Sequence, residues 1–166
     1  MLRSLIHLLA FSSVTALTCA QTSGDLRNLI EQRVQAASSG SVELALEQAG
    51  TIVGLANEEN RAGLRADLDR WIARSSELSE PARILVLAAR TRLGEADLKA
   101  IATELVALVG SKQDAVGQSA AQLLADRGFR ALRESEIDPA VKALAAGAKD
   151  AQRAPACRLA CAVATW

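Results

Sequence analysis

The sequence SEPARILVLAARTRLG, from Ser79 to Gly94, carries the signals of a short capped helix in consecutive positions. Ser79 can cap the first turn, and Pro81 stands in that turn, where its missing N–H is not needed. An apolar run follows from Ile84 to Leu93, and Gly94 is suited to end the helix. The stretch therefore predicts one member of a fold that is built from short helices.

Apolar residues recur at helical spacing on both sides of this stretch. Asp25, Asp114 and Asp138 are the expected N-caps of three further helices. In the helix that follows Asp138-Pro139, Val141 and Leu144 are expected to face the core, and the last helix is expected to be still running at Trp166. In total we expect about eight helices, and those outside Ser79–Gly94 start near Asp25, Val42, Arg61, Leu98, Asp114, Asp138 and Ala154.

Composition agrees with an all-α fold. Half of the 166 residues are apolar, mainly Ala, Leu, Val and Ile, and the chain has two Phe, two Trp and no Tyr. Ala and Leu are strong helix formers, whereas strands favour β-branched and aromatic residues. Lys plus Arg balance Asp plus Glu at 19 each, so charge gives no reason to expect nucleic acid or an anionic membrane as the partner. We predict one helical domain over residues 21–166.

Residues 1–20 have the layout of a secretory signal peptide. A basic residue near the start precedes an apolar run from Leu5 to Leu17, and Thr18-Cys19-Ala20 fits cleavage after Ala20. This apolar run is shorter than a typical transmembrane helix. We therefore predict export, either to a periplasm or out of the cell. The alternative is a lipid anchor on Cys19, although threonine is a poor residue before a lipid-modified cysteine.

Cleavage after Ala20 would remove the only histidine, His7, and would leave Cys157 and Cys161 as the only cysteines. A chain without histidine cannot form a Ser-His-Asp site, a Cys-His site or a histidine-ligated metal centre. We therefore predict that the mature chain has no catalytic residue, no cofactor and no metal ligand, and that it is not an enzyme.

A pair of small residues recurs in three of the expected helices. Ala88-Ala89 aligns with Ala120-Ala121 at an offset of 32 residues, and Ala160-Cys161 aligns with the same pair at an offset of 40. In the second alignment, Ala156 falls on Val116. Small residues at these positions would let neighbouring helices lie close together.

This pattern resembles the second helix of HEAT repeats, in which an acidic or proline start, a valine, two alanines and a leucine recur. The resemblance covers about residues 79–166, and Asp114-Ala115-Val116, Ala120-Ala121 and Leu124 carry it best. It implies a right-handed α-solenoid of stacked antiparallel helix pairs, whose concave face usually binds other proteins. The chain departs from the family at Gly117, where arginine is usual, and in its unequal offsets. Tetratricopeptide repeats are the nearest alternative, but their marker aromatic positions are empty here.

Cys157 and Cys161 are four residues apart on one expected helix. Such positions share a face with Cβ atoms about 5–6 Å apart, whereas a relaxed disulfide needs ~3.8 Å. Free cysteine also behaves as a small, well-buried apolar residue. We interpret both cysteines as core residues. Redox or metal chemistry, and pairing with a group beyond this chain, are the alternatives.

Acidic residues cluster at Glu58-Glu59 and again at Glu134, Glu136 and Asp138. A carboxylate pair performs acid–base chemistry only where a desolvated pocket separates the two pKa values. These clusters fall in polar segments that are expected to be turns. We therefore interpret them as helix-capping and solvated groups.

The stretch RADLDRWIARS, from Arg65 to Ser75, alternates arginine with aspartate. Asp67 and Asp69 predict surface pairs with neighbouring arginines instead of a basic patch for an acidic partner. Trp71 stands at helical spacing with Leu68, so we interpret it as a core residue and not as a binding aromatic.

Together these features predict an exported, non-catalytic helical-repeat scaffold whose partner is another protein. Nucleic acid is not expected, and membrane contact is expected only through the signal peptide or a lipid anchor on Cys19. The alternative is the N-terminal helical region of a larger exported enzyme with its catalytic domain beyond Trp166. That alternative arises because Ala162–Trp166 is apolar, whereas solenoids end in polar capping repeats.

Overall fold

The computed structural model describes residues 23–94, 98–128 and 134–165. Within these ranges the chain forms eight α-helices and no strand, which confirms the all-α prediction. The predicted signal peptide at residues 1–20, which includes His7 and Cys19, lies outside them. The helices are α1 (Ser23–Ser38), α2 (Val42–Gly54), α3 (Arg61–Ala73), α4 (Glu80–Arg92), α5 (Leu98–Val109), α6 (Asp114–Leu123), α7 (Glu134–Lys149) and α8 (Pro155–Val163); a 3-10 turn, η1 (Ser75–Glu77), precedes α4, and a π-helical turn, η2 (Leu124–Gly128), extends α6.

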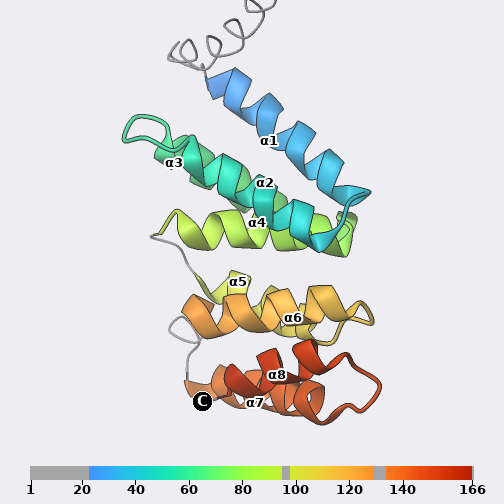
Figure 1. Cartoon of the computed structure of the whole chain (residues 1–166). Coiled ribbons are helices and arrows are strands. Elements are labelled where there is room, and N and C mark those ends of the chain that lie inside the picture. The colour runs from blue at the N-terminus through green and yellow to red at the C-terminus, as the bar shows by residue number, and fades with distance from the viewer. Residues whose placement is uncertain (1–22, 95–97, 129–133, 166) are drawn as a thin grey trace, which may run out of the picture.

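The even-numbered helices pack against one another in chain order. Helix α2 packs on α4, α4 on α6, and α6 on α8. Helices α3, α5 and α7 each contact the even-numbered helix that follows them, and α1 contacts α2, α3 and α4. As Figure 1 shows, the helices follow one another along the molecule, from α1 at one end to α7 and α8 at the other.

Two apolar cores fill this arrangement, and α4 contributes to both. The N-terminal core gathers buried residues of α1 to α4, and the C-terminal core gathers those of α5 to α8 together with Val42 of α2. Leu85 and Ala88 of α4 belong to the N-terminal core, whereas Ile84 and Leu87 belong to the C-terminal core. Ten of the thirteen residues of α4 are buried, as expected of a helix that is apolar on most of its sides.

The stretch Ser79–Gly94 folds as its sequence predicts. The Ser79 hydroxyl accepts a hydrogen bond from the N–H of Ala82 at 3.5 Å, and Pro81 lies in the first turn. Gly94 follows the helix with φ of +71°, in the left-handed region that glycine adopts without strain. Its carbonyl accepts a hydrogen bond from Arg90 at 2.9 Å, so the end of α4 is also held by a side chain.

Three predicted helix starts are wrong in detail. Helix α1 begins two residues before Asp25, which therefore lies in its first turn. Asp114 is the first residue of α6, and the N-cap is Gln113, which makes no side-chain capping bond. Helix α7 begins five residues before Pro139, so this proline lies inside the helix. There it has no N–H for a backbone hydrogen bond, and its ring crowds the carbonyl four residues earlier, so this position weakens the first half of α7.

Three further predictions also need correction. Val141 is 37% exposed, because Ala140 and Leu144 hold the inward face of α7 and Val141 is turned away from it. Helix α8 ends at Val163, and Ala164 is its C-cap, so it does not run to the chain end. The proposed match of Ala156 with Val116 fails because Ala156 is exposed and Val116 is buried. At the same offset of 40, three pairs of positions are buried at both members: Gly117 with Cys157, Ala121 with Cys161, and Leu124, in the turn after α6, with Ala164, the C-cap of α8.

Candidate functional site

A groove of about 410 Å³ lies on the surface between the second half of α1 and the end of α3. Its apolar lining comes from Val34 of α1, Trp71 of α3 and Leu78, which directly follows η1. The groove also carries polar side chains that reach water. These are Glu31, Gln35, Ser38 and Ser39, all on α1 or just after it.

Trp71 in this groove contacts a basic side chain of its own chain. The guanidinium carbon of Arg74 lies 5.6 Å from the centre of the indole ring, within the range of a cation–π contact. Glu77 accepts hydrogen bonds from Arg74, the shortest at 2.6 Å. These bonds raise the pKa of Arg74, with a further contribution from the charge of Glu31, and they lower the pKa of Glu77. The cation of Arg74 therefore lies near two carboxylates, those of Glu77 and Glu31.

The prediction that Trp71 is a core residue holds only in part. Trp71 packs against the N-terminal core, but it is partly exposed and lines the groove. The sequence did contain a signal of this second role. Arg74 and Glu77 follow Trp71 at intervals of three residues, the spacing at which side chains meet on a helix.

The two cysteines form a second notable cluster. Cys157 and Cys161 are free thiols, and both are fully buried in α8, as predicted for core residues. A Cβ atom added to Gly117 of α6 would lie 3.4 Å from the sulfur of Cys157, and one added to Gly147 of α7 would lie 2.8 Å from the sulfur of Cys161. The sulfur atoms therefore occupy space that two side-chain-free positions leave open.

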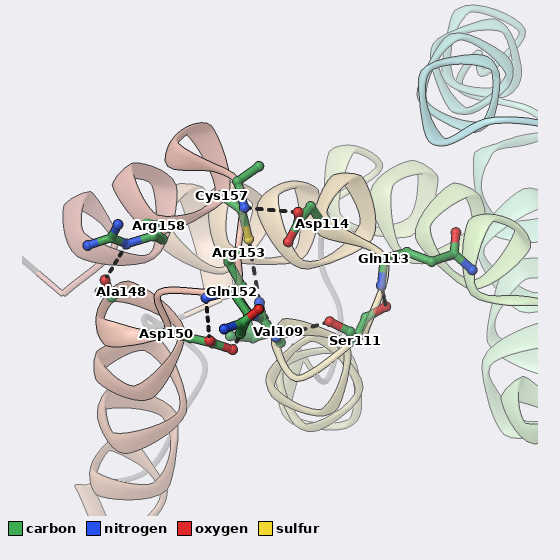
Figure 2. A network of polar contacts seen from close by, with 11 residues as sticks. Val109, Ser111, Gln113, Asp114, Ala148, Asp150, Gln152, Arg153, Cys157 and Arg158 are labelled. Carbon is green, nitrogen blue, oxygen red and sulfur yellow. Dashed lines mark hydrogen bonds and ion pairs between the residues drawn. The ribbon is translucent and has the colours of Figure 1, made fainter.

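Arg153 joins this cluster to the end of α5. Its Nη1 donates hydrogen bonds to the carbonyl of Val109 at 2.7 Å and to the sulfur of Cys157 at 3.4 Å (Figure 2). Its Nη2 donates to the carbonyl of Ser111 at 3.0 Å. A cation at these carbonyls satisfies acceptors that the helix itself leaves unpaired and interacts favourably with the helix dipole.

Asp114 has a role that its position in the sequence did not reveal. Its Oδ2 accepts a hydrogen bond from the N–H of Ala154 at 2.9 Å, forty residues along the chain (Figure 2). The carboxylate therefore ties the start of α6 to the start of α8 instead of capping its own helix.

The buried environment of Cys161 favours its neutral thiol form. Burial raises the pKa of Cys161 to about 11, and the neighbouring Cys157 adds to the rise. A thiol with a raised pKa holds little thiolate at neutral pH, and the thiolate is both the nucleophile and the metal ligand. Among the described residues, no group of three or more His, Cys, Asp or Glu is placed to hold a metal ion.

The two predicted acidic clusters lie in different local structures, one in a turn and one in a helix. Glu58 and Glu59 are exposed in the turn that precedes α3, as expected. The second cluster was assigned to a turn, and this is wrong, because Glu134, Glu136 and Asp138 belong to α7. Asp138 is exposed, and the side chains of the other two lie outside the described part of the structure.

The aspartates of α3 pair with arginines, but only one pair is local. Asp67 pairs with Arg70 in its own helix. Asp69 accepts hydrogen bonds from Arg90 of α4 at 2.7 and 3.2 Å, and the Arg90 side chain is only 4% exposed. The prediction of surface pairs within α3 is therefore wrong for Asp69, which ties α3 to α4.

Over the ranges that the structure covers, no helix combines the length and apolar character needed to cross a membrane. Comparison of the chain with protein-family models, with curated proteins and with solved structures found no match. Arguments about function therefore depend on the chain itself.

Proposed function

We propose that this chain is an exported, non-catalytic helical-repeat protein of the HEAT type, a right-handed α-solenoid that acts by binding another protein. The observation that carries the proposal is the packing of α2, α4, α6 and α8 on one another in chain order, with α3, α5 and α7 beside them. In a solenoid each repeat contacts its immediate neighbours, and this is the contact order expected of one.

The equivalent burial of α6 and α8 supports the same proposal. Of the six buried positions from Val116 to Leu124, three have buried counterparts at a constant offset of 40 residues: Gly117 and Ala121 in α8, and Leu124 at Ala164, the C-cap of α8. A repeated structural unit requires such equivalence, because each copy packs its inward residues against the copy before it.

Two surface features support a binding role. The groove between α1 and α3 exposes part of Trp71, and aromatic side chains are enriched where proteins meet their partners. On α8, Leu159 is 64% exposed and Val163 is 61% exposed, one turn apart on one face. Neighbouring exposed apolar side chains of this kind mark surfaces that another molecule covers.

The proposed binding role is tested by crosslinking the tagged full chain in intact cells of its native host, followed by direct binding measurements with the purified partner. We expect one recurrent partner that binds the purified chain saturably. Recovery of the chain alone, as a monomer that binds none of the crosslinked proteins, would overturn the proposal. Export is tested separately by fusing residues 1–20 to a reporter enzyme that is active only outside the cytoplasm, and an inactive fusion would contradict it.

A second candidate is that the chain is the helical N-terminal region of a larger exported enzyme. The exposed face of α8 favours it, because Leu159 and Val163 are suited to pack against a further helix pair. The coding sequence downstream of Trp166 decides this point. An open frame that encodes a catalytic domain supports the second candidate, and a stop codon removes it.

A further inference from the structure

We propose that the groove between α1 and α3 binds a segment of a partner protein in which a basic side chain stands beside apolar ones. This inference rests on the proposed protein-binding function and names the chemistry of the partner. It depends on the shape of the groove, on its charges, and on the contact that Trp71 already makes.

The shape of the groove suits side chains of an extended segment. Its volume of about 410 Å³ lies within the range of roughly 300–1,000 Å³ that is common for ligand pockets. The lining combines a buried residue, Val34, with two partly exposed ones, Trp71 and Leu78, so apolar surface is reachable from outside. Because the polar residues of α1 in the groove are exposed, an entering chain can keep its backbone hydrated while apolar side chains reach Trp71 and Leu78.

The charges around the groove favour a cation. Arg74 is neutralised by Glu77, which accepts its hydrogen bonds with both carboxylate oxygens. In the described part of the chain, Glu31 has no hydrogen-bond or ion-pair partner, although its charge is close enough to Arg74 to raise the pKa of the guanidinium. With one guanidinium and two carboxylates, this side of the groove carries one uncompensated negative charge, at Glu31.

Trp71 shows the kind of group that its ring accepts. Arg74, its neighbour one turn along the chain, already places a guanidinium 5.6 Å from the ring centre. The side chains of Arg74 and Glu77 are 59% and 58% exposed, so the pair can shift together away from the ring when another cation arrives. A basic side chain of a partner can then contact the indole and Glu31 together, while the adjacent apolar side chain packs on Leu78.

Fluorescence of Trp71 provides a direct test. The full chain with Trp166→Phe retains Trp71 as its only tryptophan, so its emission reports on the groove. The probes are three capped tripeptides, acetyl-Leu-Arg-Leu-amide, acetyl-Leu-Gln-Leu-amide and acetyl-Leu-Glu-Leu-amide. We expect a saturable change in emission, with affinity for the arginine peptide about threefold or more above that for the glutamine peptide, and weakest binding for the glutamate peptide.

The variant Glu31→Gln tests the charge. It should weaken binding of the arginine peptide about threefold and leave binding of the glutamine peptide unchanged. Glu58→Gln is the matched control, because Glu58 is an equally exposed glutamate that does not line the groove. Circular dichroism of each variant confirms that the helices are intact.

Four outcomes would overturn the inference. Equal affinity for the three peptides, or no loss of arginine-peptide binding in Glu31→Gln, would show that the groove does not select a cation. The absence of any saturable change up to the solubility limit of the peptides would show that it does not bind such a segment. If the crosslinked partner binds the Glu31→Gln chain as tightly as the original chain, the binding function stands and only this groove is wrong.

Discussion

Gly117→Ala is expected to destabilise the protein, although alanine is the better helix former. In most exposed helical positions the change from glycine to alanine stabilises by up to about 1 kcal/mol. At Gly117 of α6, however, the added Cβ would lie 2.7 Å from Nη1 of Arg153 and 3.2 Å from the carbonyl oxygen of Val109. A separation of 2.7 Å is too short for carbon and nitrogen that are not bonded, so the guanidinium must move.

The cost follows from what holds the guanidinium in place. Arg153 donates to the carbonyls of Val109 at 2.7 Å and Ser111 at 3.0 Å, and its side chain is only 11% exposed. A hydrogen bond from a charged group contributes about 1.5–3 kcal/mol. Loss of one such bond therefore exceeds the gain in helix propensity. Taken together, these two effects should make Gly117→Ala lower the free energy of unfolding by about 0.5–2 kcal/mol.

Urea unfolding followed by circular dichroism at equilibrium measures this difference. Gly63→Ala is the matched control, because Gly63 lies in α3 with no atom within 4 Å of its added Cβ, and this variant should gain about 0.5–1 kcal/mol. When Arg153 is first replaced by methionine, Gly117→Ala should cost much less, because the displaced group is gone. A Gly117→Ala chain as stable as the original one, together with a stabilised Gly63→Ala chain, would refute the argument.

Three further predictions follow from buried and exposed groups. Because burial raises the pKa of Cys161 from 9.0 to about 11, the folded state holds this proton more tightly than the unfolded state. As the pH rises from about 9 to about 11, the urea midpoint should therefore fall, and the contribution of Cys161 to this fall should be absent in Cys161→Ala. Arg90→Met should lower the free energy of unfolding by about 2–4 kcal/mol, because it removes a buried side chain that bonds Asp69 and Gly94; Asp69→Asn, at a more exposed position, should cost less than half as much. Leu159→Gln should change the free energy of unfolding by less than about 0.5 kcal/mol, because this leucine is 64% exposed. An equal loss of stability in Leu159→Gln and Arg90→Met would contradict the assignment of Leu159 as exposed and of Arg90 as a buried bonding residue.

Local sequence signals predicted the elements of the fold well. Ser79, Pro81 and Gly94 act through the backbone within one turn of their own positions, and the structure places each of them as expected. The small pairs Ala88-Ala89 and Ala120-Ala121 are also buried, as their position on the apolar face of each helix indicated.

Contacts between distant residues were not predictable in the same way. Asp114 was assigned as a helix cap from its local sequence, yet its carboxylate accepts from the N–H of Ala154, and Arg90 bonds an aspartate of the preceding helix. A charged side chain has several possible partners within reach of its rotamers, and only the packing of the helices selects one of them. The groove was not predicted, for the same reason. The spacing of Trp71 shows that it shares a helix face with Leu68, but it does not show that Val34 and Leu78 leave part of the Trp71 side chain exposed.

The shared helix α4 has a consequence for the order in which the molecule forms during synthesis. Every residue of the N-terminal core is present once the ribosome has added Leu93, so this core can close while the rest of the chain is still being made. Ile84 and Leu87 would then lie uncovered on the finished half and would offer α5 and α6 a preformed surface on which to fold. Growth of the chain and growth of the structure would thus proceed in the same direction.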